Sequence, residues 1–125
     1  TPQSIHSLGG HKVQGKAEVD AMKLIDDAKR LEQAGCFAIV LECIPNKLGD
    51  CASRAVSVPT IGIGAGPMTD GQVLVLHDLL GADPDFCPKF LRRYANVNHL
   101  VDQALEGFHE DVVSRSFPAI EESYG

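Results

Sequence analysis

The sequence has 125 residues, the length of one ordinary domain and enough to bury a hydrophobic core. Its 17 acidic and 11 basic residues argue against a protein that binds nucleic acid or an anionic membrane surface. No apolar run approaches the ~20 residues of a membrane span, and no signal-peptide pattern opens the chain. The four cysteines form no Cys-x-x-Cys pair, which excludes a zinc ribbon or a thioredoxin-like motif, and we expect a reducing, cytoplasmic setting.

Residues 7–15 are rich in glycine and predict a loop with unusual backbone angles. His11 and Lys12 could face a ligand there, or the segment could be a plain surface loop, so their roles stay open. His6 and His11 are five residues apart with no third ligand spaced for zinc, and we predict no metal site.

Residues 17–34 have the helical period and are followed by Gly35, a residue typical of helix ends. We expect Met22 and the apolar stripe to belong to the core rather than to a cofactor site. The stripe consists of Ala21, Leu24, Ile25, Ala28 and Leu31.

Residues 36–41 are an uninterrupted apolar run, and the carboxylate of Glu42 follows it. Such a run predicts a strand buried on both faces, as in a parallel sheet. The C-terminal end of a parallel strand faces the ligand crevice or the barrel mouth, so Glu42 is a candidate general base. There it would be half out of water, which should raise its pKa. Alternatively, Glu42 caps the next helix or pairs with a Lys or Arg.

Residues 47–56 predict a short helix, and residues 58–66 predict a second strand that ends in glycines. The spacing of Gly62, Gly64 and Gly66, with Pro67 after them, does not fit a dinucleotide fingerprint, and no P-loop follows. The glycines indicate either a strand end where backbone approaches a neighbour or ligand closely, or a plain tight turn.

Residues 72–77 predict a third buried strand, which would place His77 and Asp78 at a strand end. A catalytic role for this pair competes with a structural one, because Asp78 could cap the following segment and adjacent strand residues point to opposite faces. Residues 79–93 predict a loop and short turn, residues 98–114 a helix, and residues 121–125 a loose tail.

Helices alternating with apolar strands indicate an α/β chain with parallel strands. Three such strands leave long apolar edges, which natural folds cover or close. A (β/α)₈ barrel closes its edges but takes about 250 residues, twice the present length. We therefore expect this chain to form part of a barrel whose other strands lie elsewhere.

Several segments, in order along nearly the whole chain, resemble the ketopantoate hydroxymethyltransferase family. They are Thr1-Pro-Gln-Ser4, Gly9-Gly-His-Lys-Val-Gln-Gly15, Leu41-Glu-Cys-Ile-Pro45, Pro59-Thr-Ile-Gly-Ile-Gly-Ala-Gly66, Asp70-Gly-Gln-Val-Leu-Val-Leu-His-Asp78, Pro88-Lys-Phe90 and Tyr94-Ala-Asn96. The resemblance implies a (β/α)₈ TIM barrel of the phosphoenolpyruvate mutase and isocitrate lyase group, of which residues 1–125 are the C-terminal portion.

The resemblance also implies a reaction. The family moves a hydroxymethyl group from 5,10-methylenetetrahydrofolate to 3-methyl-2-oxobutanoate, giving ketopantoate on the way to pantothenate. Mg²⁺ holds the keto acid, and the Glu of the Leu-Glu-Cys-Val/Ile-Pro motif, here Glu42, removes the C3 proton. The family's magnesium-binding acids lie in the other half of its barrel, so we expect no metal ligand in this chain.

Three interpretations follow: a homo-oligomeric hydroxymethyltransferase, a related lyase acting on a 2-oxo acid, and a non-catalytic fragment or assembly module. Aldehyde release without folate separates the first two. The mass of the source protein tests the third.

Overall fold

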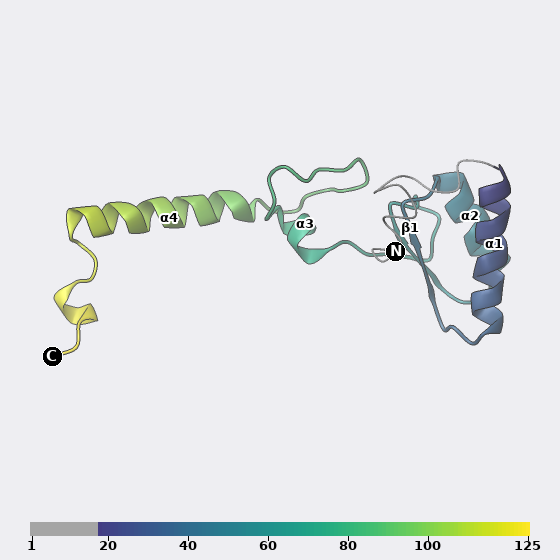
Figure 1. Cartoon of the computed structure of the whole chain (residues 1–125), viewed down its shortest axis with the longest axis horizontal. Coiled ribbons are helices and arrows are strands. Elements are labelled where there is room, and N and C mark those ends of the chain that lie inside the picture. Colours follow the sequence, from purple (N-terminus) through teal and green to yellow (C-terminus); the bar gives the residue numbers. More distant parts are fainter. Residues whose placement is uncertain (1–17) are drawn as a thin grey trace. The chain divides into compact units, whose positions relative to one another are not determined.

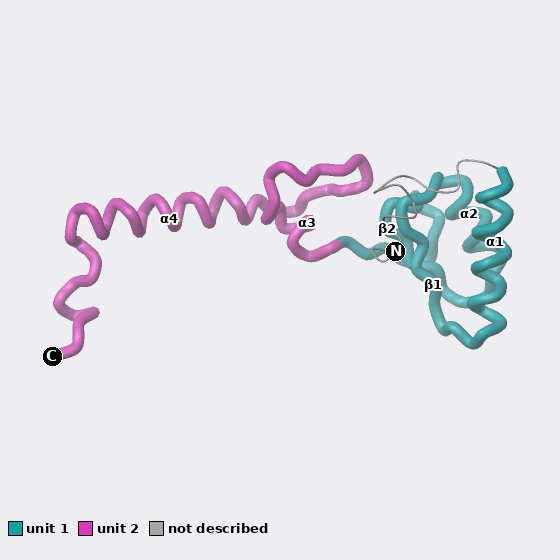
Figure 2. The backbone as a smooth tube through the Cα atoms, viewed as in Figure 1, with its two compact units in different colours: residues 1–74 teal, residues 75–125 magenta. Residues whose placement is uncertain are grey.

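The computed structural model describes residues 18–125, which divide into two compact units, residues 18–74 and residues 75–125 (Figure 2). The predicted loop at residues 7–15, with His11 and Lys12, lies outside the described residues. No helix in the described part of the chain is long and apolar enough to cross a membrane.

The described part of the first unit is an α/β layer (Figure 1). Its elements in chain order are α1 (Glu18–Gln33), β1 (Ile39–Glu42), α2 (Asn46–Ala55), β2 (Thr60–Ile63) and β3 (Gly71–Gln72). The strands form one parallel sheet in the order β1-β2-β3. The predicted parallel α/β architecture is therefore confirmed.

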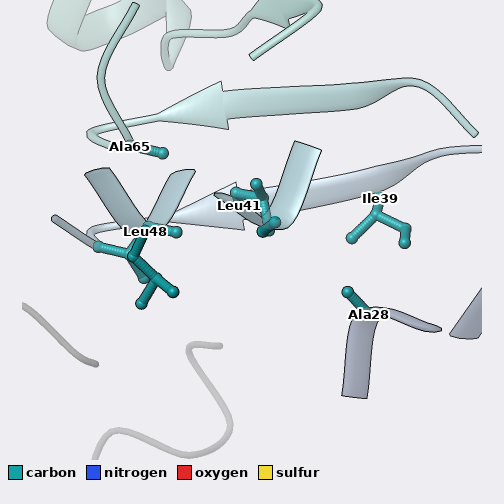
Figure 3. Packing of buried hydrophobic residues seen from close by; sticks show 7 residues of the cluster. Ala28, Ile39, Leu41, Leu48 and Ala65 are labelled. Atoms are coloured by element: carbon teal, nitrogen blue, oxygen red, sulfur yellow. The ribbon is translucent and has the colours of Figure 1, made fainter. Parts of the chain in front are cut away.

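The core of this unit lies between the sheet and its two helices (Figure 3). The cluster joins Ala28 of α1, Ile39 and Leu41 of β1, Leu48 of α2 and Ala65, and Figure 3 shows Ala28 on the side of Ile39. Ala21, Leu24 and Ile25 pack against this cluster, as the helical stripe predicts, whereas Leu31 of the same stripe is 46% exposed, so the prediction is wrong for that residue. Burying these apolar side chains holds the helices to one face of the sheet.

Met22 does not belong to that core, and the prediction that it does is wrong. Its side chain is 64% exposed. Successive side chains of a helix are rotated by about 100° about its axis. Met22, directly after Ala21, therefore lies off the stripe that Ala21, Leu24, Ile25 and Ala28 form. Position on the helix, rather than hydrophobicity alone, decides which side chains are buried.

The glycines in the last part of β2 and directly after it serve close packing, which confirms the prediction that the backbone approaches a neighbour there. Gly66 has a φ of 85°, and a Cβ on it would lie 2.5 Å from Cβ of Asn46. A Cβ on Gly62 would lie 2.6 Å from Oγ1 of Thr69. The segment after β2 thus lies directly against β2 and the start of α2.

The second unit contains α3 (Leu76–Leu80), α4 (Val97–Ser114) and the 3₁₀ turn η2 (Ile120–Glu122). The predicted helix at 98–114 is confirmed, whereas the predicted strand at 72–77 is wrong because β3 ends at Gln72 and α3 begins at Leu76. All of α4 after Asn98 is exposed within the described structure, and Phe108 meets Phe117 edge to face.

Candidate functional site at the carboxyl end of β1

Glu42 is the last residue of β1, at the C-terminal end of a parallel strand. Side chains along β1 alternate: Ile39 and Leu41 are buried against the helices, whereas Val40 and Glu42 are exposed. Since successive strand residues point to opposite faces, Glu42 stands on the sheet face that α1 and α2 leave uncovered. The predicted strand-end position of the acid is confirmed.

Apolar side chains share that uncovered face with Glu42. Ile63 of β2 is paired with Glu42, and Ile61 is paired with Val40, which is 61% exposed. Gly71 of β3 is paired with Ile61, and a Cβ on it would lie 2.9 Å from Cδ1 of Ile61. The Glu42 carboxylate therefore lies at the end of a sheet face that is otherwise formed by the apolar side chains of Val40, Ile61 and Ile63. In such surroundings a carboxyl group becomes a better base once water is excluded.

The backbone turns sharply directly after the acid. Cys43 has a positive φ of 50°, and its N–H donates to the carbonyl of Ile63 at 2.9 Å. The next N–H, that of Ile44, donates to the carbonyl of Gly64 at 3.1 Å. Burial raises the pKa of the Cys43 thiol, and the nearby Glu42 carboxylate raises it further. The thiol form is thus favoured beside the acid.

An open, mostly apolar groove lies beside Glu42, along α1 and the free edge of β1. This edge is free because, within the described residues, β1 pairs with β2 alone. An unpaired edge offers N–H and C=O groups to a further strand. The groove is lined by Leu24, Ala28, Leu31, Ile39, Val40, Leu41, Glu42 and Ile44.

Two expectations about this strand need correction. The run at 36–41 is not buried on both faces, because within residues 18–74 only the helix side of β1 is covered and Phe37 is 90% exposed. Glu42 is exposed rather than half out of water, because nothing within residues 18–74 covers its face of the sheet. The dehydration predicted for the acid would have to come from other parts of a complete protein.

The structural alternatives for Glu42 are not seen in the described part of the chain. Helix α2 begins after Pro45 without a side-chain capping bond. The two ion pairs between residues 18 and 125 join Lys23 to Asp27 and Asp50 to Arg54. The carboxylate of Glu42 is therefore engaged neither as a cap nor as an ion pair there.

His77 and Asp78 do not lie at a strand end, and that expectation is wrong. Both belong to helix α3 in the second unit, where the carbonyls of His77 and Asp78 accept bonds from Ala82 and Gly81. Between residues 18 and 125, no group of three or more His, Cys, Asp or Glu side chains could hold a metal ion. The described residues thus do not fit a magnesium site, and no chemical step is assigned to a metal here.

A buried hydroxyl network at the other end of β2 was missed in the sequence. Thr60 is only 1% exposed, and its N–H and Oγ1 donate to Oδ2 of Asp70 at 2.8 and 3.0 Å. Its Oγ1 also lies 2.7 Å from Oγ of Ser53 on α2. The backbone bond and the hydroxyl of Thr60 hold the pKa of Asp70 below its ordinary value. Sequence spacing carries no signal for such a contact, since it depends on strand register.

The described part of the first unit is thus an α/β protein with a parallel sheet, and Glu42 lies at the carboxyl end of a strand, where such proteins commonly bind their ligands. The sequence profile described as ketopantoate hydroxymethyltransferase matches residues 1–120. The chain belongs to this family.

Curated relatives named 3-methyl-2-oxobutanoate hydroxymethyltransferase match nearly all of the chain. The relative from Chlorobaculum tepidum is 54% identical over 123 residues, which are 98% of this chain and 44% of that protein. Those from Coxiella burnetii and Geobacter metallireducens are each 52% identical, over 97% and 94% of this chain and 46% and 44% of their own length. The chain thus spans less than half the length of these relatives.

Proposed function

We propose that this chain serves in a hydroxymethyltransferase that converts 3-methyl-2-oxobutanoate to ketopantoate with 5,10-methylenetetrahydrofolate as donor, a step of pantothenate biosynthesis. Membership of the family supports the reaction. The single structural observation that carries it is the place of Glu42, at the carboxyl end of β1 on the uncovered face of the sheet.

We propose further that residues 1–125 are the C-terminal portion of one (β/α)₈ barrel of the phosphoenolpyruvate mutase and isocitrate lyase group. The parallel strands, with α1 and α2 on one face, have the layering of such a barrel. Its closure would pair the free edge of β1 and turn the face of Val40, Glu42, Ile61 and Ile63 into the interior. That interior would exclude water from Glu42, which the described residues alone do not do.

In the proposed reaction the Glu42 carboxylate accepts the proton at C3 of the keto acid. The electron pair of the broken C–H bond passes into the keto group and forms an enolate. C3 then forms a bond to the methylene carbon of the folate, both bonds from that carbon to folate nitrogens break, and one water supplies the hydroxyl group. The proton taken from C3 and the second proton of that water end on the two nitrogens, which gives tetrahydrofolate. Mg²⁺ as a Lewis acid would stabilise the enolate, with its ligands in the part of the relatives that this chain does not match.

We propose the cytoplasm as the location, in keeping with four cysteines that are all free thiols. The partners would be the small keto acid, the folate and further copies of the same protein. An apolar stripe of α4 that is exposed within residues 18–125 offers a surface for a homo-oligomer. It consists of Val101, Leu105, Phe108 and Val112.

The test uses a chimera in which residues 1–125 replace the matching segment of the Chlorobaculum tepidum relative. With both substrates and Mg²⁺, the chimera is expected to form ketopantoate, and the unmodified relative is the positive control. Aldehyde release without folate would indicate a lyase instead. A chimera that folds with the relative's thermal stability but forms no ketopantoate would contradict the proposal and favour a non-catalytic assembly module.

A further inference from the structure

We propose that Cys43 is a positioning residue for Glu42, and that it acts through its left-handed backbone conformation rather than through its thiol. The inference rests on the proposed role of Glu42 as the base. It concerns how the fold aims the carboxylate, not which group accepts the proton.

The conformation of Cys43 is unusual for a residue with a Cβ. Within residues 18–125 only Cys43 and Arg115 combine a side chain with a positive φ, and Arg115 ends helix α4. A side chain makes the left-handed region unfavourable, so such a residue persists where its surroundings fix it. The surroundings of Cys43 are the end of β2 and the core.

The end of β2 holds the turn through two consecutive N–H groups. In a regular parallel ladder, alternate residues direct their N–H toward the neighbouring strand. Cys43 and Ile44 are adjacent, yet both donate to β2 and its exit, at the carbonyls of Ile63 and Gly64. The left-handed residue permits this, as in a β-bulge, and it stops the ladder directly after Glu42.

The same turn moves the next side chain to the other face of the sheet. If β1 continued as a regular strand, Ile44 would point to the same side as Glu42. Instead Ile44 is 5% exposed and belongs to the core cluster with Leu41 and Leu48. Cys43 is therefore the residue at which the chain leaves the uncovered face and is anchored in the core.

Glu42 depends on this anchor because its own backbone has no partner on the β2 side. The N–H of Ile39 donates to Pro59, directly before β2, and that of Cys43 donates to Ile63 of β2, so the alternation of the ladder directs the N–H of Glu42 toward the free edge. The direction of its Cα–Cβ bond is then set by the residues on either side. A different backbone angle at Cys43 would displace the carboxylate, and a misplacement of 1 Å can cost about 100-fold in rate.

The experiment compares four variants of the chimera at Cys43 by the rate at which the C3 proton of the keto acid exchanges with solvent deuterium. Cys43→Val places a β-branched residue, the least suited to positive φ, and Cys43→Ala is the milder form. Cys43→Asn and Cys43→Gly remove the thiol but tolerate the conformation. Cys51→Val, on the exposed side of α2, is the matched control.

We expect kcat for exchange to fall at least about 10-fold in Cys43→Val with little change in KM, and less in Cys43→Ala. The Asn and Gly variants should rescue the rate. A purely structural residue would lower the melting temperature without this selective loss of kcat, and unchanged kcat in folded Cys43→Val would overturn the inference. If that variant does not fold, equal kcat for the Ala and Asn variants would overturn it.

The same measurements distinguish a failure of the proposed function from a failure of the positioning role of Cys43. Should exchange in the unmodified chimera persist after Glu42→Gln, the base assignment itself is wrong. Should Glu42→Gln abolish exchange while the Cys43 series leaves kcat unchanged, only the positioning role is wrong. Equal loss of kcat in all four Cys43 variants would assign the effect to the thiol and contradict the role of the backbone.

Discussion

Glu42 and Ile63 are paired across the parallel strands β1 and β2, at the carboxyl end of both. Both side chains stand on the face of the sheet away from the core of Ile39, Leu41 and Leu48. The acid is therefore flanked by an aliphatic side chain on the neighbouring strand. A base in that position would accept a proton from carbon most readily if the rest of a barrel excluded water.

Gly49 is the first position where the fold makes a sharp prediction. A Cβ there would lie 2.2 Å from the carbonyl oxygen of Ala65, and both residues are buried. Because backbone has to move, we expect Gly49→Ala to destabilise the chimera by about 1–3 kcal/mol in urea unfolding. Gly107→Ala is the control: nothing lies within 4 Å of its added Cβ, and alanine in a helix interior is expected to be neutral or stabilising. Equal stability of Gly49→Ala and the parent would contradict this packing.

The hydroxyl of Thr60 gives a second prediction. Thr60→Val keeps the shape of the side chain but removes the donor to Asp70 and the neighbour of Ser53. We expect a loss of about 1–3 kcal/mol in the free energy of unfolding. In a double-mutant cycle with Ser53→Ala, the two changes should be non-additive by at least about 0.5 kcal/mol. Additive effects would mean that the two hydroxyls do not interact.

The sequence predicted those elements whose pattern has one physical explanation. Most of the stripe of α1 and the acid at the end of β1 lie where the sequence pattern placed them, and the helix ends agree within one or two residues. The apolar residues 73–76 did not form a strand, because a short apolar run has no period that separates strand from helix.

The environment of Glu42 was beyond sequence reasoning for a different reason. Burial depends on what covers a face, and nothing within residues 18–74 covers this one. The left-handed conformation of Cys43 could not be predicted from the sequence either, since a positive φ is not expected at residue types other than Gly, Asn or Asp. The pairing of Thr60 with Asp70 depends on the register of β2 and β3, which no spacing rule supplies.

Glu32 links the end of α1 to the segment before β2 and predicts a dependence on pH. Its carboxylate accepts bonds from the hydroxyl and N–H of Ser57 and from the N–H of Val58. The hydroxyl of Ser57, then its N–H, hold the pKa of Glu32 below its ordinary value. A lowered folded-state pKa means that the contribution to stability is present above the unfolded-state value of about 4.3 and is lost as pH falls through the folded-state value.

Glu32→Gln should therefore lower the melting temperature of the chimera at pH 7, with the difference shrinking as pH falls below about 4. Melting curves across this range test it. Asp26→Asn, which changes an exposed carboxylate on the same helix, is the control and should show a smaller difference at pH 7. A difference that grows toward low pH would have the wrong sign for this contact.

The most direct measurement for the central claim is exchange of the C3 proton of 3-methyl-2-oxobutanoate in deuterium oxide, followed by NMR with the chimera, its Glu42→Gln variant and a Glu18→Gln control. We predict that Glu42→Gln lowers the exchange rate by at least about 100-fold while binding of the keto acid and Mg²⁺ is largely kept, and that Glu18→Gln exchanges like the parent. Exchange at the parental rate in folded Glu42→Gln would remove Glu42 from the role of base.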